Sequence, residues 1–273
     1  MYESYWRLTS APFENDANPA HYFPGRSHHG ALLKLRYLIE NRKGVGLVVG
    51  GHGAGKSFLT HVLEQQLAER FRPVVRLVYP QLTPSELLST LAVRLGEPAT
   101  SVDSHQGADV IFARLERRLT THVREGQSPV IIIDEAHLLE TTHLQTLQLL
   151  LNLQQQQPDL FSLVLCGRPD LLNRVRKLPA LHDRVAVRTT LHPLSEEEST
   201  QYIKHRLKIA GLETAVFDPD ALRSFWQLSQ GVPRKINQLC DLSLLVGFAD
   251  GLEKLTRIEV EAAAEELCGV SAD

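Results

Sequence analysis

Short apolar runs and stretches of helical spacing alternate along the first two thirds of the chain. The runs are rich in β-branched residues, and the stretches carry leucines every three or four positions, the spacing of an amphipathic helix. Strands that alternate with helices predict an α/β domain with a largely parallel sheet. Strands are expected near residues 47–49, 73–79, 129–133, 161–166 and 184–188, and helices near residues 30–41, 58–70, 84–95, 108–124 and 142–156.

The pattern changes after Pro193, where no further strand is expected. Helix-start signals recur instead: Ser195 with Glu198 forms a capping box, and Asp218 precedes a proline as an N-cap. We therefore expect two domains. Residues 1–193 form an N-terminal lead-in plus a nucleotide-binding α/β domain, and residues 194–273 form a small all-helical domain.

The nucleotide is predicted from a motif that follows the first apolar run. Residues 50–57 match the phosphate-binding P-loop, G-x-x-x-x-G-K-[ST]. Glycines allow positive φ, so that backbone N–H groups form an anion-binding nest at the start of a helix. Lys56 is expected to reach the β- and γ-phosphates. The predicted nucleotide-binding residues are Gly50, Gly51, His52, Gly53, Ala54, Gly55, Lys56, Ser57 and Phe58.

A Walker B pattern is the second motif. Four β-branched or apolar residues at 130–133 suit a central strand buried on both faces, and Asp134 and Glu135 follow it. We expect Asp134 and Ser57 to hold Mg²⁺, and Glu135 to activate the attacking water as a general base. The two motifs together predict ATP and Mg²⁺ as ligands, and hydrolysis of ATP to ADP and phosphate.

Hydrolysis also needs positive charge aimed at the transition state. Spacing alone does not choose among the arginines of the second half of the chain. The candidates are Arg168, Arg174, Arg176, Arg184, Arg188 and Arg234.

A P-loop, a strand that ends in Asp-Glu and a helical C-terminal region together resemble the AAA+ ATPases. More closely, the chain is similar to the ExeA/GspA family of general secretion pathway ATPases. The resemblance implies an α/β P-loop NTPase (AAA+) fold, with a parallel sheet flanked by helices and followed by a small all-helical lid domain. The pieces that carry it include Ala11-Pro12-Phe13, Tyr22-Phe23-Pro24, Ile133-Asp134-Glu135-Ala136-His137, Gly167-Arg168-Pro169-Asp170-Leu171 and Gly231-Val232-Pro233-Arg234.

The resemblance also implies roles for single residues. Arg234 matches the sensor 2 arginine of the lid, and Arg184 matches the arginine finger that reaches into a neighbouring subunit. Tyr22 and His28 fall in the segment that would line the adenine pocket, with N-terminal packing as the alternative. Arg168 occupies the sensor 1 position, where glutamine is usual, and is expected to read the γ-phosphate or to act in trans. A finger requires a homo-oligomer, as a ring or a filament.

Composition and charge limit which ligands and which cellular location can be expected. The net charge of -3 gives no overall basic excess, and three widely spaced cysteines suggest neither a zinc site nor a disulfide framework. No signal peptide and no direct membrane span are expected. The secretion members commonly continue into a membrane span and a cell-wall-binding region, whereas this chain stops at Asp273. We expect a cytoplasmic motor, peripheral to the inner membrane through a partner.

Three functional interpretations remain open. In the first, an oligomeric ATPase drives or gates assembly of a secretion or envelope machine through a protein partner. In the second, the chain is an ATP-dependent DNA-binding adaptor of the transposition (MuB/TniB) type, with basic clusters within residues 34–43 or 174–177 on DNA. In the third, slow hydrolysis makes it a nucleotide switch that recruits a partner.

Overall fold

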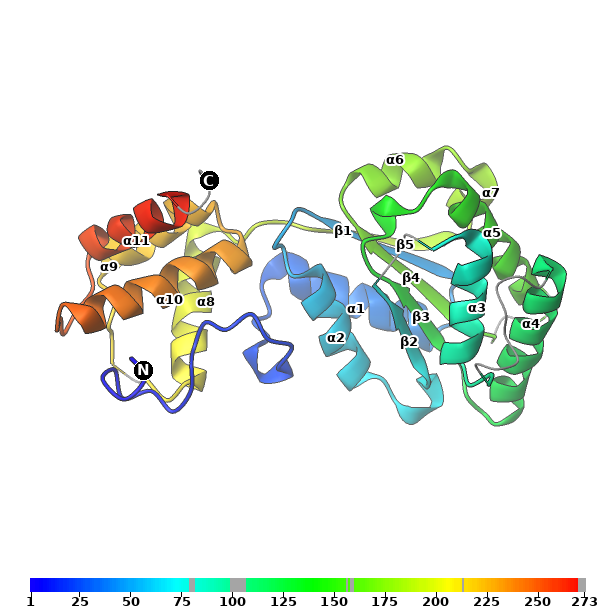
Figure 1. The fold of residues 1–273 in the computed structure, drawn as a ribbon, viewed down its shortest axis with the longest axis horizontal. Coiled ribbons are helices and arrows are strands. Elements are labelled where there is room, and N and C mark those ends of the chain that lie inside the picture. The colour runs from blue at the N-terminus through cyan, green and yellow to red at the C-terminus, as the bar shows by residue number, and fades with distance from the viewer. Residues whose placement is uncertain (79–81, 99–106, 156, 158–159, 213, 270–273) are drawn as a thin grey trace. The chain divides into compact units, whose positions relative to one another are not determined.

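The chain packs as two units (Figure 1). A computed structural model describes residues 1–273 with the exception of 79–81, 99–106, 156, 158–159, 213 and 270–273. The sheet unit contains Ser27–His52 and Lys56–Leu191. The helical unit contains Met1–Arg26, Gly53–Gly55 and His192–Asp273.

Five parallel strands form the sheet, in the order β2-β3-β4-β1-β5. The three inner strands are buried at every position, as expected for apolar strands covered on both faces, while the edge strands alternate. The parallel α/β prediction is therefore confirmed. The strands are β1 (Val45–Gly50), β2 (Val74–Leu77), β3 (Val130–Ile133), β4 (Ser162–Gly167) and β5 (Val185–Leu191).

Helices cover both faces of this sheet (Figure 1). Alternate residues of β1 show the two faces: a Cβ on Gly46 would lie 3.2 Å from Leu35 of α1, whereas Leu47 belongs to the core formed with α3 to α7. The absent side chain at Gly46 therefore lets α1 approach the sheet closely. The helices are α1 (Arg26–Glu40), α2 (Lys56–Gln66), α3 (Pro84–Arg94), α4 (Ala108–Arg124), α5 (Thr141–Asn152), α6 (Asp170–Arg176) and α7 (Pro179–His182).

Two of these helices were not expected. α6 and α7 have seven and four residues, too few turns for an apolar repeat to become visible in the sequence. The helix expected to reach residue 70 ends at Gln66, and a 3₁₀ turn, η2 (Glu69–Phe71), follows it. The helix expected near residues 142–156 ends at Asn152, and Gln156 lies outside the described residues.

Helices and no further strand follow the sheet in the described residues, as predicted. The Ser195 hydroxyl accepts the Glu198 N–H, the Glu198 carboxylate accepts the Ser195 N–H, and Asp218 accepts the Ala221 N–H, so the predicted caps are formed. The helices are α8 (Glu196–Ile209), α9 (Pro219–Ser229), α10 (Pro233–Ala249) and α11 (Arg257–Gly269). No helix in the described part of the chain is long and apolar enough to cross a membrane.

The lead-in packs against these helices. Trp6 and Phe13 are buried in the core of the helical unit, and the Trp6 indole donates to the carbonyl of Leu244 at 2.9 Å. The sequence grouped residues 1–193 together, whereas packing places Met1–Arg26 with the helices after His192. Aromatic side chains show that a segment needs an apolar partner, but not which helices supply it.

Candidate functional site

The P-loop joins β1 to α2. Gly53 and Gly55 have φ values of 73° and 88°, in the left-handed region that glycine adopts without steric cost. The backbone thereby turns sharply between the end of the strand and the first turn of the helix. This is the strand–loop–helix context that a phosphate-binding loop requires.

Lys56 is the first residue of α2 and is only 6% exposed. Its ammonium donates to the carbonyls of Gly50 at 3.0 Å and Gly51 at 2.9 Å. Within the described residues it forms no ion pair with a carboxylate. A buried cation held only by its own loop is suited to the phosphates of a nucleotide.

Asp134 follows β3 at the same end of the sheet as the P-loop. The strands β1 and β3 flank β4 and run parallel to it, so their carboxyl ends lie on one side. Asp134 is 4% exposed, and its carboxylate accepts the Glu135 N–H at 2.9 Å. Burial raises the pKa of the Cys166 thiol of β4, and the next contributions are the charges of Asp134, Arg76 and Lys56. Charged side chains on β2, on α2 and directly after β3 thus lie near the end of β4.

Glu135 has a φ of 49°, which is uncommon for a residue with a side chain. Its carboxylate lies 3.2 Å from Nδ1 of His137, while the Glu135 side chain remains 41% exposed. His137 is buried in the 3₁₀ turn η4 (Ala136–Leu138). A Cβ on Gly167 would lie 2.9 Å from the His137 backbone nitrogen, so this glycine leaves room for the turn.

Arg168 is exposed directly after β4. Burial, followed by the positive charge of Arg168, holds the pKa of His137 below its ordinary value. Arg168 is therefore close to the turn that carries Glu135. Arg174, in contrast, donates to the Leu139 carbonyl at 2.9 Å, a contact that fixes α6 rather than the site.

Arg184 lies at the amino-terminal ends of the strands, whereas the P-loop lies at their carboxyl ends. Its carbonyl accepts the N–H of Val45, the first residue of β1, and its guanidinium donates to Asn152 at 2.6 Å. From Val45 to the P-loop, β1 runs six residues, which is roughly 17 Å of strand. Arg184 is thus separated from the nucleotide site of its own chain.

The remaining predicted residues divide between the units. His28 is buried in the sheet unit on α1, with Nδ1 3.3 Å from the Ser27 hydroxyl. Tyr22 and Arg234 belong to the helical unit, where Arg234 lies in the first turn of α10. Burial raises the pKa of Tyr22 to about 12, and its hydroxyl has no hydrogen bond among the described residues. Their assignment to adenine and γ-phosphate stays a prediction.

The sequence argument missed Arg76. This side chain of β2 donates to the Thr60 hydroxyl at 2.6 Å and forms an ion pair with Glu64 at 3.4 Å, both on α2. It also reaches the carbonyl of Ser57 at 3.5 Å. Arg76 thereby orients the helix that begins with the P-loop lysine. The sequence does contain a signal for this role, because Arg76 interrupts an otherwise apolar strand.

The residues at this edge fit a nucleotide with a hard divalent cation. The Ser57 side chain is exposed at the start of α2, and a hydroxyl with a carboxylate such as Asp134 is the oxygen donor set that Mg²⁺ prefers. Over the described ranges, no group of three or more His, Cys, Asp or Glu side chains could hold another metal. Ser57 and Asp134 would therefore hold the cation, and Lys56 the phosphates.

Comparison with known proteins agrees with this geometry. The profile of the AAA domain family matches residues 39–175. The chain is 32% identical over 272 residues to General secretion pathway protein A of Aeromonas hydrophila, covering 99% of this chain and 49% of that protein. It is 25% identical to an HTH-type transcriptional regulator of Methanocaldococcus jannaschii, covering 82% of this chain and 63% of that protein. The chain thus spans about half to two thirds of these relatives.

Solved structures share the fold. The ORC1 protein of Aeropyrum pernix, in complex with DNA, superposes with a TM-score of 0.71 at 17% identity, covering 96% of this chain and 69% of that one. The Thermotoga maritima RuvB Holliday junction branch migration motor gives a TM-score of 0.59 at 18% identity, covering 88% of this chain and 69% of that one. At these identities the likeness concerns architecture.

Proposed function

The chain belongs to the AAA domain family, and we propose that it is an AAA+ ATPase that binds ATP with Mg²⁺ and hydrolyses it to ADP and phosphate. The observation that carries the proposal is the convergence of three groups at one edge of the sheet. These are the buried Lys56, the buried Asp134 and the partly exposed Glu135.

Each group has a distinct role in this proposal. The P-loop N–H groups and Lys56 bind the phosphates and stabilise charge on the transferred phosphoryl group. Ser57 and Asp134 hold Mg²⁺, which neutralises phosphate charge when bound. Glu135 accepts a proton from water as the water oxygen bonds to the γ-phosphorus, and the bond to the β–γ bridging oxygen breaks to release ADP.

A homo-oligomer completes the site in this proposal. Arg184 is remote from the P-loop of its own chain, so its guanidinium can reach a γ-phosphate only in another copy. We place Arg168 and, from the lid of residues 194–273, Arg234 as further cations toward the γ-phosphate, and Tyr22 and His28 toward adenine. A ring or a filament satisfies these assignments.

The work that hydrolysis performs is proposed from similarity. General secretion pathway protein A matches nearly the whole of this chain, which supports a role in assembly or regulation of a secretion or export machine. The chain spans about half of that protein, so the role belongs to this proposal and not to the site itself. A protein partner would place the ATPase at the cytoplasmic face of the inner membrane.

Two variants test the ATPase. Lys56→Ala should abolish tight binding of ATP–Mg²⁺ in calorimetry, and unchanged affinity would remove the P-loop assignment. Glu135→Gln should still bind ATP but hydrolyse it at least about 100-fold more slowly, the usual effect of losing a general base. Glu140→Gln, an exposed acid in the same stretch, is the matched control and should hydrolyse ATP at the normal rate.

Assembly is tested with the same trapped protein. The mass of Glu135→Gln in ATP–Mg²⁺ is measured by light scattering, with and without duplex DNA. A closed ring that forms without DNA supports the machine-assembly role. Assembly on DNA alone would replace that role with the adaptor.

One observation favours the DNA-binding adaptor as a second candidate. Residues 168–188 carry six Arg or Lys and two Asp, a net charge of +4, whereas the whole chain carries -3 and the remaining residues therefore -7. Such a local basic region attracts phosphate backbones even on an acidic protein. A steep fall in DNA affinity with added salt would support this candidate.

A further inference from the structure

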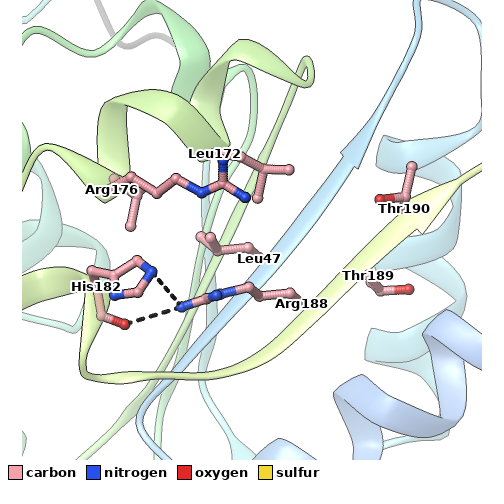
Figure 2. A pocket seen from close by; sticks show the side chains of 8 residues that line it. Leu47, Leu172, Arg176, His182, Arg188, Thr189 and Thr190 are labelled. Atoms are coloured by element: carbon pink, nitrogen blue, oxygen red, sulfur yellow. Dashed lines mark hydrogen bonds between the residues drawn. The ribbon is translucent and has the colours of Figure 1, made fainter.

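A small pocket lies beside β5 on the face of the sheet that α6 and α7 cover (Figure 2). Its volume is about 100 Å³. The buried side chain of Leu47 contributes an apolar lining, and Thr190 of β5 lies at its margin. Arg176 approaches from α6 and Arg188 from β5, one on each side of Leu47 in this view.

Arg188 is held in position by a chain of polar contacts. Its guanidinium donates to Nε2 of His182 at 2.9 Å and to the His182 carbonyl at 3.4 Å. Because Nε2 accepts this bond, the ring proton is on Nδ1, which lies 3.4 Å from the Asp183 carboxylate. Asp183 therefore orients His182, and His182 orients Arg188. The same terminal nitrogen makes both Arg188 contacts, which leaves the other guanidinium nitrogens available.

Arg176 has no protein partner in the part of the chain that the structure describes. Within the described residues it makes no hydrogen bond and no ion pair, and no carboxylate pairs with Arg188 either. Arg176 and Arg188 are both solvent-exposed, so water screens the repulsion between their guanidinium groups, and an anion between them would be attracted to both. Residues 168–188 around the pocket have a net charge of +4, whereas the whole chain has a net charge of -3. The acidic residues of this segment are therefore too few to neutralise its arginines and lysine.

We propose that this pocket is a binding site for a phosphate group, held between Arg176 and Arg188. The site does not depend on the ATPase proposal, because its residues lie outside the P-loop and the Walker B strand. Arg188 is a binding residue, and His182 is a positioning residue that acts through it.

The donor arrangement favours phosphate over carboxylate. The two guanidinium groups come from different elements, α6 and β5, and would therefore contact an anion from different directions. A tetrahedral phosphate offers several oxygens to such donors, while a planar carboxylate suits one bidentate arginine. A charge near -2 also matches two arginines. A phosphate group fits a cavity of this volume, whereas a nucleotide would need much more room.

The test uses the full chain with its nucleotide site filled by a non-hydrolysable ATP analogue and Mg²⁺. Inorganic phosphate is titrated at constant ionic strength while amide NMR signals of His182, Arg188 and Thr190 are followed. Signals of the P-loop report any competition at the nucleotide site. We expect saturable shifts at the pocket with the P-loop signals unchanged.

Variants assign the binding to the pocket. Arg176→Ala and Arg188→Ala should each weaken phosphate binding about tenfold, the usual effect of losing a charge-assisted hydrogen bond. Lys177→Ala removes an equal charge from the residue next to Arg176 without lining the cavity, and should change the affinity less than about twofold. Arg188→Lys keeps the charge and provides a second variant if the alanine protein unfolds; it should bind more weakly than wild type.

Two results would overturn the site: the absence of saturable shifts in the wild-type protein, or equal losses in Lys177→Ala and Arg188→Ala. A final arm identifies the source of the phosphate. If duplex DNA displaces inorganic phosphate and shifts the same signals, the ligand is a backbone phosphate. If DNA leaves those signals unchanged while free phosphate binds, the ligand is a small phosphate or phosphorylated molecule, and the site stands in both cases.

Discussion

The carboxylate of Glu135 lies 3.2 Å from Nδ1 of His137, a side chain that is almost fully buried. Nδ1 makes no well-aligned hydrogen bond within the described residues, so a small rotation of Glu135 would supply one. Burial and the charge of Arg168 hold the pKa of His137 below its ordinary value, which keeps the imidazole neutral near pH 7. A neutral ring can orient the carboxylate without the full positive charge that would weaken it as a base.

His137→Ala should therefore lower kcat about tenfold and leave KM within about twofold, because orientation of the proposed base is lost while the phosphate-binding groups remain. His137→Gln, whose amide can donate to Glu135, should recover part of the rate. Steady-state ATPase assays measure both values.

A structural control comes from His143, another buried histidine of the sheet unit, whose Nε2 contacts the Leu82 carbonyl. His143→Ala should lower thermal stability and leave kcat of the folded protein nearly unchanged. Equal losses of kcat in both alanine variants would assign His137 to packing alone.

Arg184→Ala should retain ATP binding and lose most hydrolysis, because the proposed finger acts on a neighbouring copy. The loss should be restored in part by mixing with Lys56→Ala protein, which supplies Arg184 to the intact nucleotide site of the first variant. Arg174→Ala is the matched control, since that arginine instead binds the Leu139 carbonyl. Mixing that restores no activity would argue against action in trans.

The sheet and the P-loop were readable from the sequence because both depend on local pattern. Buried parallel strands are continuous apolar runs, and the loop needs glycines at positions of positive φ. The caps at Ser195 and Asp218 were readable for the same reason, since each is satisfied within three residues.

Long-range relationships were not readable. The remoteness of Arg184 from its own P-loop follows from the register of β5 against β1, which pairs Val185 with Val45. The contact of Arg76 with α2 likewise joins residues that only the fold brings together. Short helices such as α7 carry too few turns to leave a periodic signal.

The attachment of the lead-in gives a stability prediction. Arg206 is 4% exposed and donates to the carbonyls of Pro12 at 2.7 Å and Glu14 at 2.8 Å. Arg206→Met would leave both acceptors unsatisfied and should lower the free energy of unfolding by about 3 kcal/mol. The control Arg223→Met removes an exposed ion pair with Glu196 and should cost at most about 0.5 kcal/mol.

Tryptophan fluorescence during urea unfolding can measure both changes. The two tryptophans, Trp6 and Trp226, belong to the helical unit, so the signal reports the unit that contains Arg206. A loss below about 1 kcal/mol in Arg206→Met would show that the lead-in is held by its aromatic side chains instead.

His205 should make the stability of the helical unit depend on pH. Burial lowers the pKa of His205 from its ordinary value of 6.5. A hydrogen bond with the Tyr22 backbone raises this pKa, and the nearby basic residues Arg206, His21 and Lys208 lower it further. The folded state therefore holds the proton less tightly than the unfolded state does. The stabilisation is present above pH 6.5 and is lost as the pH falls from 6.5 toward the lowered folded pKa, because the unfolded chain takes up the proton first.

The measurement is the urea midpoint by tryptophan fluorescence at pH 7.5 and at pH 5.5. The midpoint of the wild-type protein should fall on acidification, and His205→Gln should show a smaller fall because it carries no titrating ring. His29→Gln, at an exposed histidine, is the control and should keep the wild-type dependence. Since His205 lies against Phe23, with ring centroids 5.8 Å apart, a protonated ring would disturb the lead-in segment that contains Tyr22. Identical pH dependences in wild type and His205→Gln would assign acid sensitivity to other groups and leave this segment unlinked to pH.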